Sequence, residues 1–400
     1  MRGAKVVTTT LIMERFLEKS ITDMLSLLKE LVNQDSGSQY IIGVNKVGQI
    51  IRQQFEHLGF EVKEVKQQKT GNHLVIQHKD AVNPSILLIA HMDTVYKEGT
   101  AAIRPFTIAH NRAYGPGVID MKGSHVAIIY AVKALLDAGK YDVLKNIVLL
   151  FNSDEEIGSP TSRKLIERVA LDKDCCICLE PARENGALVS ARRGGGDYII
   201  KVHGRASHAG IAPEEGANAI EEIAHKIIKL HKLNRPIEGI SVNCDIIHGG
   251  MAANVIADYA ETCVDIRTSK VEQAEFLEEK IQEICNETFV PGTKTELFGT
   301  INRPPMEKNR GTIALLERIY SLAEQLEIKL SDVATGGGGD ASFTSALGIP
   351  TIDGLGPIGG FAHSEREYLE IPSLVERTLL LAKFMESLTA KKLETDKVFT

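Results

Sequence analysis

Short apolar runs alternate with helix-like patterns over the first half of the chain. Three of these runs are too short for a buried helix and suit strands covered on both faces: 86–90, 147–151 and 175–179. Two further strands are expected at 62–65 and 74–77, and apolar residues recur at helical spacing at 13–33, 44–58, 124–138 and 162–169. Strands that alternate with helices predict an α/β fold with a mostly parallel sheet covered by helices.

The order of elements changes after the Arg-Arg-Gly-Gly-Gly stretch at 192–196. A strand, a helix, two strands, a helix and a strand are expected at 198–203, 215–230, 239–248, 259–267, 271–289 and 293–297. This order is the ferredoxin-like α+β unit. The α/β pattern returns at 312–326, 351–352 and 372–388. We therefore expect a discontinuous catalytic domain, 1–191 and 303–400, with an inserted lid domain at 192–302; the polar end, 390–400, is expected to fray.

Each of the three apolar runs leads into potential ligands. His91 and Asp93 follow the first run, Glu155 and Glu156 the second, and Glu180 the third. In open α/β sheets, ligands bind off the carboxyl ends of the strands. Because residues i and i+2 of an extended chain point the same way, Asp93 can orient His91 for metal binding. Taken alone, this pair fits a buried strand that ends in a solvated turn better than a metal site.

The whole donor set adds Asp120 and His363. Carboxylate oxygens and imidazoles without a nearby thiolate favour Zn²⁺, with Co²⁺ or Mn²⁺ as alternatives. Three ligand carboxylates and one hydroxide carry a charge that two divalent ions cancel, so two ions sharing a bridging water are expected. Adjacent residues cannot easily present both side chains to one ion. Of Glu155 and Glu156, one is therefore expected to bind metal and the other to relay the proton of the water.

Composition narrows the class of protein. The 400 residues are 43% hydrophobic and 25% charged with a formal charge of −7, which fits a soluble globular protein and argues against nucleic-acid binding. No apolar run reaches the ~20 residues that span a membrane. The first twenty residues make a poor signal peptide, and Cys175, Cys176 and Cys178 are too close together to bridge, so a cytoplasmic location is expected.

Nine stretches, in order along nearly the whole chain, resemble one known family. They are LIAHMDTV (88–95), YGPGVIDMKG (114–123), NSDEEIGS (152–159), LEP (179–181), GRASHAG (204–210), GGMAANVIAD (249–258), VDIR (264–267), GGGGDASF (336–343) and GFAHSERE (360–367). The family comprises the dizinc amidohydrolases and exopeptidases related to glutamate carboxypeptidase, acetylornithine deacetylase, succinyl-diaminopimelate desuccinylase and aminoacylase. The chain is most similar to the glutamate carboxypeptidase and tripeptidase branch.

This resemblance implies a zinc-exopeptidase-like fold and a ligand set. His91, Asp120 and Glu180 would hold one zinc, and Asp120, Glu156 and His363 the other, with Asp120 bridging. The resemblance also makes Glu155 the general base and Asp93 the partner of His91, and it implies a cis peptide between Asp120 and Met121. Within this family, Glu rather than Asp at position 180 favours peptides as the expected substrates.

Five further residues are candidates for contacts with the substrate. The resemblance makes His208 a stabiliser of the oxyanion and Asn254 a polar contact, although a plain loop histidine and a turn former are the alternatives. Arg267 is a natural partner for an α-carboxylate, or else part of a surface ion pair. Gly337 and Gly338 would line the substrate pocket. The Gly-rich stretch that contains them lacks the Lys-Ser/Thr of a phosphate-binding loop.

The expected function is therefore hydrolysis of an amide bond in a small peptide or N-acyl amino acid with a free α-carboxylate. A metal-bridging hydroxide would attack, with Glu155 as general base, in a carboxypeptidase- or di/tripeptidase-like reaction. An aminoacylase or acetylornithine deacetylase activity is the alternative, and a silent metal-binding scaffold or a nucleotide enzyme is more remote. A homodimer is expected through the lid, whose strand at 239–248 offers an unpaired edge.

Overall fold

The computed structural model describes residues 2–390, which divide into two compact units. Unit 1 comprises Met1–Ser190, Lys308–Ala334 and Phe343–Thr400, and unit 2 comprises Ala191–Glu307 and Thr335–Ser342. The segment 335–342, with Gly337 and Gly338, thus belongs to unit 2, whereas the sequence placed it with the catalytic domain. The chain end expected to fray is 390–400; Ala390 ends a helix, and 391–400 lies outside the described residues.

Unit 1 is built on a six-stranded sheet. Its order is β1 (Phe60–Val65), β2 (His73–His78), β6 (Ile147–Asn152), β3 (Ile86–His91), β7 (Cys175–Cys178) and β14 (Thr351–Ile352). The four strands from β6 to β14 run parallel, β2 pairs antiparallel with β6, and β1 pairs antiparallel with β2. Every residue of β3, β6 and β7 is buried, as expected for strands covered on both faces. The predicted fold class is confirmed.

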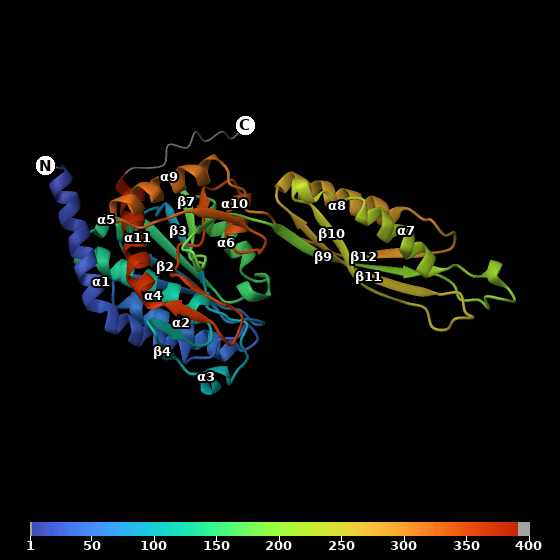
Figure 1. Cartoon of the computed structure of the whole chain (residues 1–400), viewed down its shortest axis with the longest axis horizontal. Helices are drawn as coiled ribbons and strands as arrows, with labels where there is room; N and C mark the ends of the chain where they lie inside the picture. The colour runs from blue at the N-terminus through green and yellow to red at the C-terminus, as the bar shows by residue number, and fades with distance from the viewer. Residues whose placement is uncertain (1, 391–400) are drawn as a thin grey trace. The chain divides into compact units, whose positions relative to one another are not determined.

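Helices surround this sheet. They are α1 (Arg2–Val32), α2 (Ile41–Glu56), α4 (Gly123–Asp137), α6 (Arg163–Ala170), α9 (Arg310–Gln325) and α11 (Ile371–Ala390), with the short α3 (Thr100–Ile103), α5 (Tyr141–Lys145) and α10 (Ala341–Ala346). Figure 1 shows α1, α4 and α11 side by side, and all three pack against one another. Helix α4 is buried almost all round because it lies between the sheet and these helices.

Smaller sheets carry the loops of unit 1. A four-stranded sheet has the order β15 (Gly359–Gly360), β16 (Tyr368–Glu370), β5 (Arg112–Tyr114) and β4 (Thr107–Ala109), and β8 (Leu188–Arg192) pairs with β13 (Asp332–Thr335). None of these short strands was predicted. Strand β5 lies in the Gly-rich segment that leads to Asp120, and a tight turn, Val118–Lys122, follows it.

Unit 2 has the predicted β-α-β-β-α-β order. Its elements are β9 (Gly194–His203), α7 (Ala219–His231), β10 (Ser241–Gly249), β11 (Tyr259–Thr268), α8 (Val271–Asn286) and β12 (Lys294–Arg303), with the sheet order β10-β11-β9-β12. Helices α7 and α8 cover one face of this antiparallel sheet (Figure 1). Helix α7 begins later than predicted because Asn218 caps it, accepting from the N–H groups of Ile220 and Glu221.

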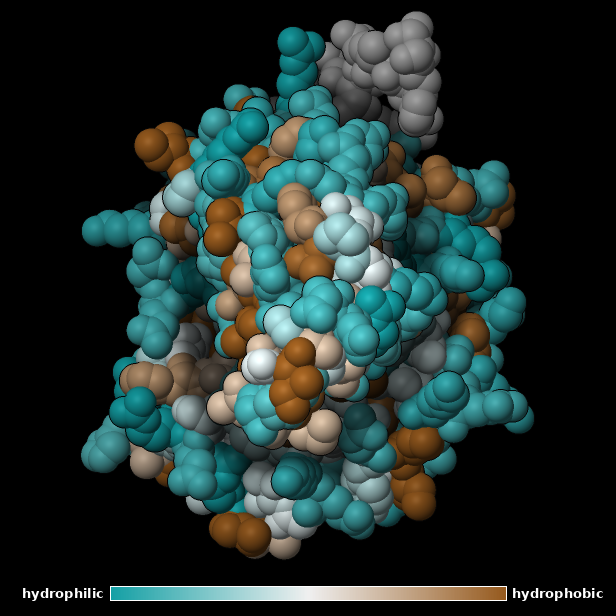
Figure 2. Space-filling view, turned by 90° about the vertical axis from the view of Figure 1, so that its right-hand side faces the viewer, coloured by the Kyte–Doolittle hydropathy of each residue, from teal (hydrophilic) through white to brown (hydrophobic). Residues whose placement is uncertain are grey.

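No helix of residues 2–390 has both the length and the apolar character needed to cross a membrane. The most apolar helix, α4, is a core helix of unit 1. The face of the molecule drawn in Figure 2 is mainly hydrophilic, with hydrophobic residues scattered over it. Single exposed hydrophobic residues of this kind are normal on protein surfaces.

Candidate metal centre

His91 is the last residue of β3 and is buried. Its Nε2 lies 3.1 Å from Asp120 Oδ1 and 3.6 Å from Glu180 Oε1, while its Nδ1 lies 2.9 Å from the carbonyl oxygen of Asp93. Burial lowers the pKa of His91, but the hydrogen bond to Asp120 and the charges of the surrounding carboxylates together outweigh it and hold the pKa well above its ordinary value. The ring is thus aimed at two carboxylates from separate elements.

Asp120 stands at the centre of the cluster. Its Oδ1 faces His91 and its Oδ2 lies 3.1 Å from Nε2 of His363. The Asp120–Met121 peptide is cis, as the resemblance implies. Although burial raises the pKa of Asp120, hydrogen bonds from His363 and His91 overcome this and lower it. One carboxylate therefore contacts both histidines, one with each oxygen.

His363 and Glu156 close the other side. Nε2 of His363 lies 3.2 Å from Glu156 Oε2, and its hydrogen bonds to Asp120 and Glu156 raise the pKa of His363 to about 10. Burial raises the pKa of Glu156. Its second oxygen, Oε1, is buried without a hydrogen-bond partner. A buried, unpaired carboxylate oxygen is costly and marks a place for a missing cation or donor.

Asp93 holds the turn that carries the two adjacent glutamates. Its carboxylate accepts hydrogen bonds from Ser38 Oγ at 2.7 Å and from the N–H groups of Glu155 and Glu156 at 3.1 and 3.2 Å. The distance from Asp93 Oδ1 to His91 Nδ1 is 3.6 Å, too long for a hydrogen bond. The carbonyl group of Asp93, rather than the carboxylate expected from the sequence, is thus the closer partner of His91.

The donors form two overlapping groups that suit metal ions. The ligand atoms of His91, Asp120 and Glu156 lie within 4.8 Å of one another, and so do those of His91, Glu155 and Glu180. Burial, together with Asp120, raises the pKa of Glu180 well above its ordinary value. Oxygen and imidazole donors in an acidic, buried cluster fit divalent cations such as Zn²⁺. The residues present therefore fit the metal that the sequence predicts.

Two predicted substrate contacts lie near each other in unit 2. Both His208 and Asn254 are exposed on loops, and the two loops are joined by a bridge between His208 and Val255 and by the hydrogen bond from Ala209 N to Asn254 O, 3.0 Å. Arg267 lies on β11 and is paired with Asp265, with Nε and Nη2 donating to its two oxygens at 3.1 and 2.6 Å. Arg267 thus already has a carboxylate partner.

The Gly-rich segment of unit 2 packs on arginine side chains. Nη1 of Arg192 donates to the carbonyl oxygens of Gly337 and Gly338, at 3.2 and 2.9 Å. A Cβ at Gly338 would come within 2.6 Å of Cδ of Arg303, which explains the need for glycine there. Carbonyl groups that face a guanidinium do not form the cradle of N–H groups that holds a phosphate.

Comparisons with known proteins identify the family. The model of peptidase family M20/M25/M40 matches residues 87–387. The chain belongs to this family. Carboxypeptidase G2 of Pseudomonas sp. (strain RS-16) is 30% identical over 374 residues, covering 92% of this chain and 90% of that protein. An acetylornithine deacetylase of Buchnera aphidicola is 29% identical and covers 79% of this chain and 84% of that protein.

The solved structures agree on the fold of this M20 peptidase. The aminopeptidase PepT of Bacillus cereus superposes with a TM-score of 0.76 at 23% identity, covering 93% of this chain and 99% of that one. Membership of the M20 family makes the chain a metal-dependent hydrolase of peptides or acyl amino acids. The suspected family, the fold class and the enzyme prediction are confirmed.

Glu367 is a residue of this centre to which the sequence assigned no role. Its buried carboxylate accepts from the N–H groups of Gly117 at 3.0 Å, Ile119 at 2.9 Å and Asp120 at 3.1 Å. Tyr96 adds a fourth donor, its hydroxyl lying 2.6 Å from Oε2. No local pattern indicates such a role because every partner is distant in sequence.

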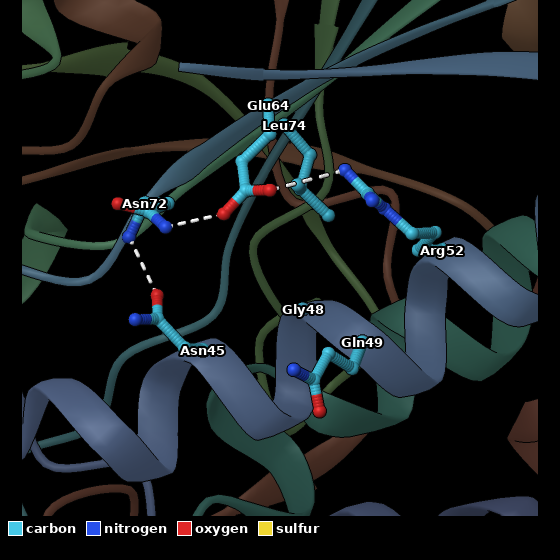
Figure 3. A pocket seen from close by; sticks show the side chains of 7 residues that line it. All are labelled: Asn45, Gly48, Gln49, Arg52, Glu64, Asn72 and Leu74. Atoms are coloured by element: carbon cyan, nitrogen blue, oxygen red, sulfur yellow. Dashed lines mark hydrogen bonds and ion pairs between the residues drawn. The ribbon is translucent and has the colours of Figure 1, made fainter. Parts of the chain in front are cut away.

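A shallow pocket of about 250 Å³ elsewhere in unit 1 is separate from this cluster (Figure 3). Helix α2 and strands β1 and β2 line it. Arg52 donates to Glu64 at 3.2 Å, Asn72 donates to the other oxygen of Glu64, and the N–H of Asn72 donates to Asn45 Oδ1 at 2.7 Å. These polar groups satisfy one another, and the lining includes no predicted site residue.

Proposed function

We propose that this M20 peptidase uses two divalent ions, with Zn²⁺ favoured over Co²⁺ and Mn²⁺, to hydrolyse an amide bond in a small peptide with a free α-carboxylate. The reaction is carboxypeptidase- or di/tripeptidase-like. The observation that carries the proposal is the convergence of five side chains from distant segments on Asp120 and its neighbours. Cations that neutralise an acidic cluster of this kind stabilise it.

The five side chains divide between the two ions. His91, Asp120 and Glu180 would hold one ion, and Asp120, Glu156 and His363 the other. The bridging role of Asp120 is supported by the opposite directions of its two oxygens, one toward each histidine. The unpaired Oε1 of Glu156 supports its place as a ligand. Each set offers one imidazole and two carboxylates, which leaves a position open for water and substrate.

Glu155 is proposed as the proton carrier. The two ions supply Lewis acidity, which lowers the pKa of the attacking water and polarises the amide carbonyl. Glu155 takes the proton of the water and delivers it to the leaving nitrogen. Asp93 fixes the backbone of Glu155 and Glu156, so that the proton carrier and the neighbouring ligand keep their relative position.

Unit 2 is proposed to supply the substrate contacts. His208 would stabilise the oxyanion, Asn254 would make a polar contact, and Arg267 would bind the α-carboxylate. The neighbouring loops of His208 and Asn254 support a shared role for these two residues. To bind the substrate, Arg267 must either release the carboxylate of Asp265 or contact both carboxylates at once. Gly337 and Gly338 are proposed to line the same pocket.

A second candidate function is deacylation of N-acyl amino acids. It is favoured by the similarity to acetylornithine deacetylase, whereas the similarity to carboxypeptidase G2 and the glutamate at position 180 favour peptides. A panel of dipeptides, tripeptides, N-acetyl amino acids and N-acyl-glutamates, assayed with Zn²⁺ or Co²⁺, tests this choice. If the chain hydrolyses only N-acetyl amino acids, deacylation replaces the peptidase proposal. If it hydrolyses no substrate, a metal-binding scaffold without catalytic activity is the remaining alternative.

The proposal includes a homodimer formed through unit 2. Strand β10 lies at the edge of the sheet, and its Ile246 and Ile247 are 50% and 55% exposed. An open edge with apolar side chains is a template for pairing with a second chain. Light scattering during size-exclusion chromatography should give twice the chain mass. The substitution Ile246→Lys should then reduce the measured mass to that of one chain.

We also propose a cytoplasmic location. All six cysteines are free, and four of them are buried: Cys175, Cys176, Cys178 and Cys285. Buried thiols without disulfides are typical of proteins that fold in a reducing compartment. Fractionation of cells that express the chain tests this point. Recovery with periplasmic or secreted marker proteins would contradict it.

A further inference from the structure

The proposed ligands are held in two different ways. His91 ends β3 and Glu180 follows β7, and both of these strands are buried in the central sheet. Asp120, Glu156 and His363 lie instead on a tight turn, a single helical turn and a loop. One ion is therefore gripped mainly by the sheet, whereas the other depends on segments that have no ladder of strand hydrogen bonds to hold them.

Glu367 joins two of these segments. It lies four residues after His363 and accepts the N–H groups of Gly117, Ile119 and Asp120. Its side chain is 1% exposed, so water does not replace these hydrogen bonds. A carboxylate that accepts several N–H groups fixes a turn firmly, because each bond is charge-assisted. The turn of Asp120 is thus tied to the loop of His363.

Tyr96 adds a link to the segment that follows His91. Its hydroxyl lies 2.6 Å from Glu367 Oε2 and 2.8 Å from the carbonyl oxygen of Ser364. The guanidinium of Arg104 lies over the Tyr96 ring at 4.9 Å and donates to the same carbonyl at 3.4 Å. The Tyr96–Glu367 pair therefore connects three ligand-bearing segments without offering a ligand atom itself.

We propose that the Tyr96–Glu367 pair is a positioning device for the ion held by Asp120, Glu156 and His363. The pair fixes the separation of Asp120 and His363 through their backbones, so that both reach one ion at once. The other ion is affected less, because β3 and β7 hold His91 and Glu180. This inference rests on the two-ion function proposed above.

The test is a metal titration of the metal-free protein, followed by competition with a chelating dye. Glu367→Gln places an NH₂ group against backbone N–H groups, and Tyr96→Phe removes only one donor. We expect the ion held by Asp120, Glu156 and His363 to bind about 10-fold more weakly in Tyr96→Phe and up to ~100-fold more weakly in Glu367→Gln. The other ion, which shares Asp120, should be weakened much less. Tyr368→Phe and Glu370→Gln, which alter a nearby hydroxyl and a nearby carboxylate, should leave both ions unchanged.

The outcomes separate the inference from the function on which it rests. If the wild type binds two ions and both variants do so with wild-type affinities, the inference is wrong and the proposed function stands. Equal weakening of both ions would also overturn it, because a general loss of structure would then be the cause. If the wild-type protein binds fewer than two ions, both the inference and the proposed two-ion function are wrong. Turnover of the variants should return when Zn²⁺ is raised, with KM unchanged.

Discussion

Each unit buries a cluster of charges, and the two clusters are neutralised differently. In unit 2, Glu222 and Lys226 on α7 are fully buried and lie 2.9 Å apart. Lys226 donates to the carbonyl groups of Ile284, Cys285 and Glu287, and Glu222 accepts from two N–H groups near the end of α8. In unit 1, four carboxylates meet two histidines, with no lysine or arginine among the metal-site groups.

This difference gives a way to distinguish a structural cluster of buried charges from a functional one. The pair in unit 2 carries its own counter-ion and caps the last turn of α8, so nothing further is required. The cluster in unit 1 has more acid than base, an unpaired oxygen on Glu156 and acids whose pKa values are raised. It is complete only with cations from solution. Five experiments test this distinction.

Removal of metal should have the largest effect. Exhaustive chelation is expected to abolish turnover and, for free metal about a thousandfold above Kd, to remove about 4 kcal/mol of stability for each ion. Re-addition of Zn²⁺ should restore both. Calorimetry of the metal-free and loaded protein measures the change in Tm. An unchanged Tm after chelation would contradict a cation-dependent cluster.

The effect of pH on this loss follows from the pKa shifts. Folding raises the pKa of His363 to about 10 and raises the pKa of Glu180, so both groups stabilise the metal-free protein at low pH. The contribution of His363 is complete below the ordinary histidine pKa of about 6.5, and that of Glu180 below the ordinary glutamate pKa of about 4.3. Each is lost as pH rises through the folded value of its group. Metal binding needs the deprotonated ligands and strengthens as pH rises. The difference in Tm between the loaded and metal-free protein should therefore grow from pH 6 to pH 8.

Replacement of Glu155 should affect the reaction but not the cluster. Glu155→Gln is expected to lower kcat by about three orders of magnitude, ~4 kcal/mol, because the proton of the water loses its acceptor. Two ions per chain and the wild-type Tm should remain. Glu167→Gln, at a carboxylate paired with Arg163 on the surface, is the control and should leave kcat unchanged. A kcat within tenfold of the wild type would assign the proton transfer elsewhere.

The parts of this centre that follow from strand patterns could be predicted from the sequence. The apolar runs before His91, Glu155 and Glu180 located three strand ends at one edge of the sheet, and all three meet in the structure. Asp120 and His363 lie in irregular segments, so no strand pattern supported their place in the donor set, and the family resemblance supplied their ligand roles. The pairing of Arg267 with Asp265 was open to prediction, because residues two apart on a strand share a face.

Other features had no local signal. Glu367 acts on backbone N–H groups about 250 residues earlier in the chain, and such a contact leaves no periodicity. The strands β5 and β16 have three residues each, too few to show alternation. Pairing between such distant segments is decided by tertiary packing, which propensity and pattern do not report.

Loss of the lysine in unit 2 should destabilise that unit without changing the chemistry. Lys226→Met leaves Glu222 buried without its counter-ion and frees three carbonyl groups, which is expected to cost about 3 kcal/mol or more. Lys229→Met, one turn away in an exposed pair with Glu287, should cost less than about 1 kcal/mol. Urea unfolding measures both. A similar loss in the two variants would show that the buried pair is not the structural element described.

Arg267 gives the smallest expected effect and the sharpest challenge to the distinction. It has a counter-ion, Asp265, and by the rule above would be structural, yet it is proposed to bind the substrate. Arg267→Ala should raise KM for free-carboxylate peptides about 10–30-fold, ~2 kcal/mol, and leave amidated analogues almost unchanged. Arg112→Ala removes a similarly exposed arginine paired with Glu370 and should change neither. Equal effects on both substrates would make Arg267 a structural residue, and the rule would then hold for every ion pair compared.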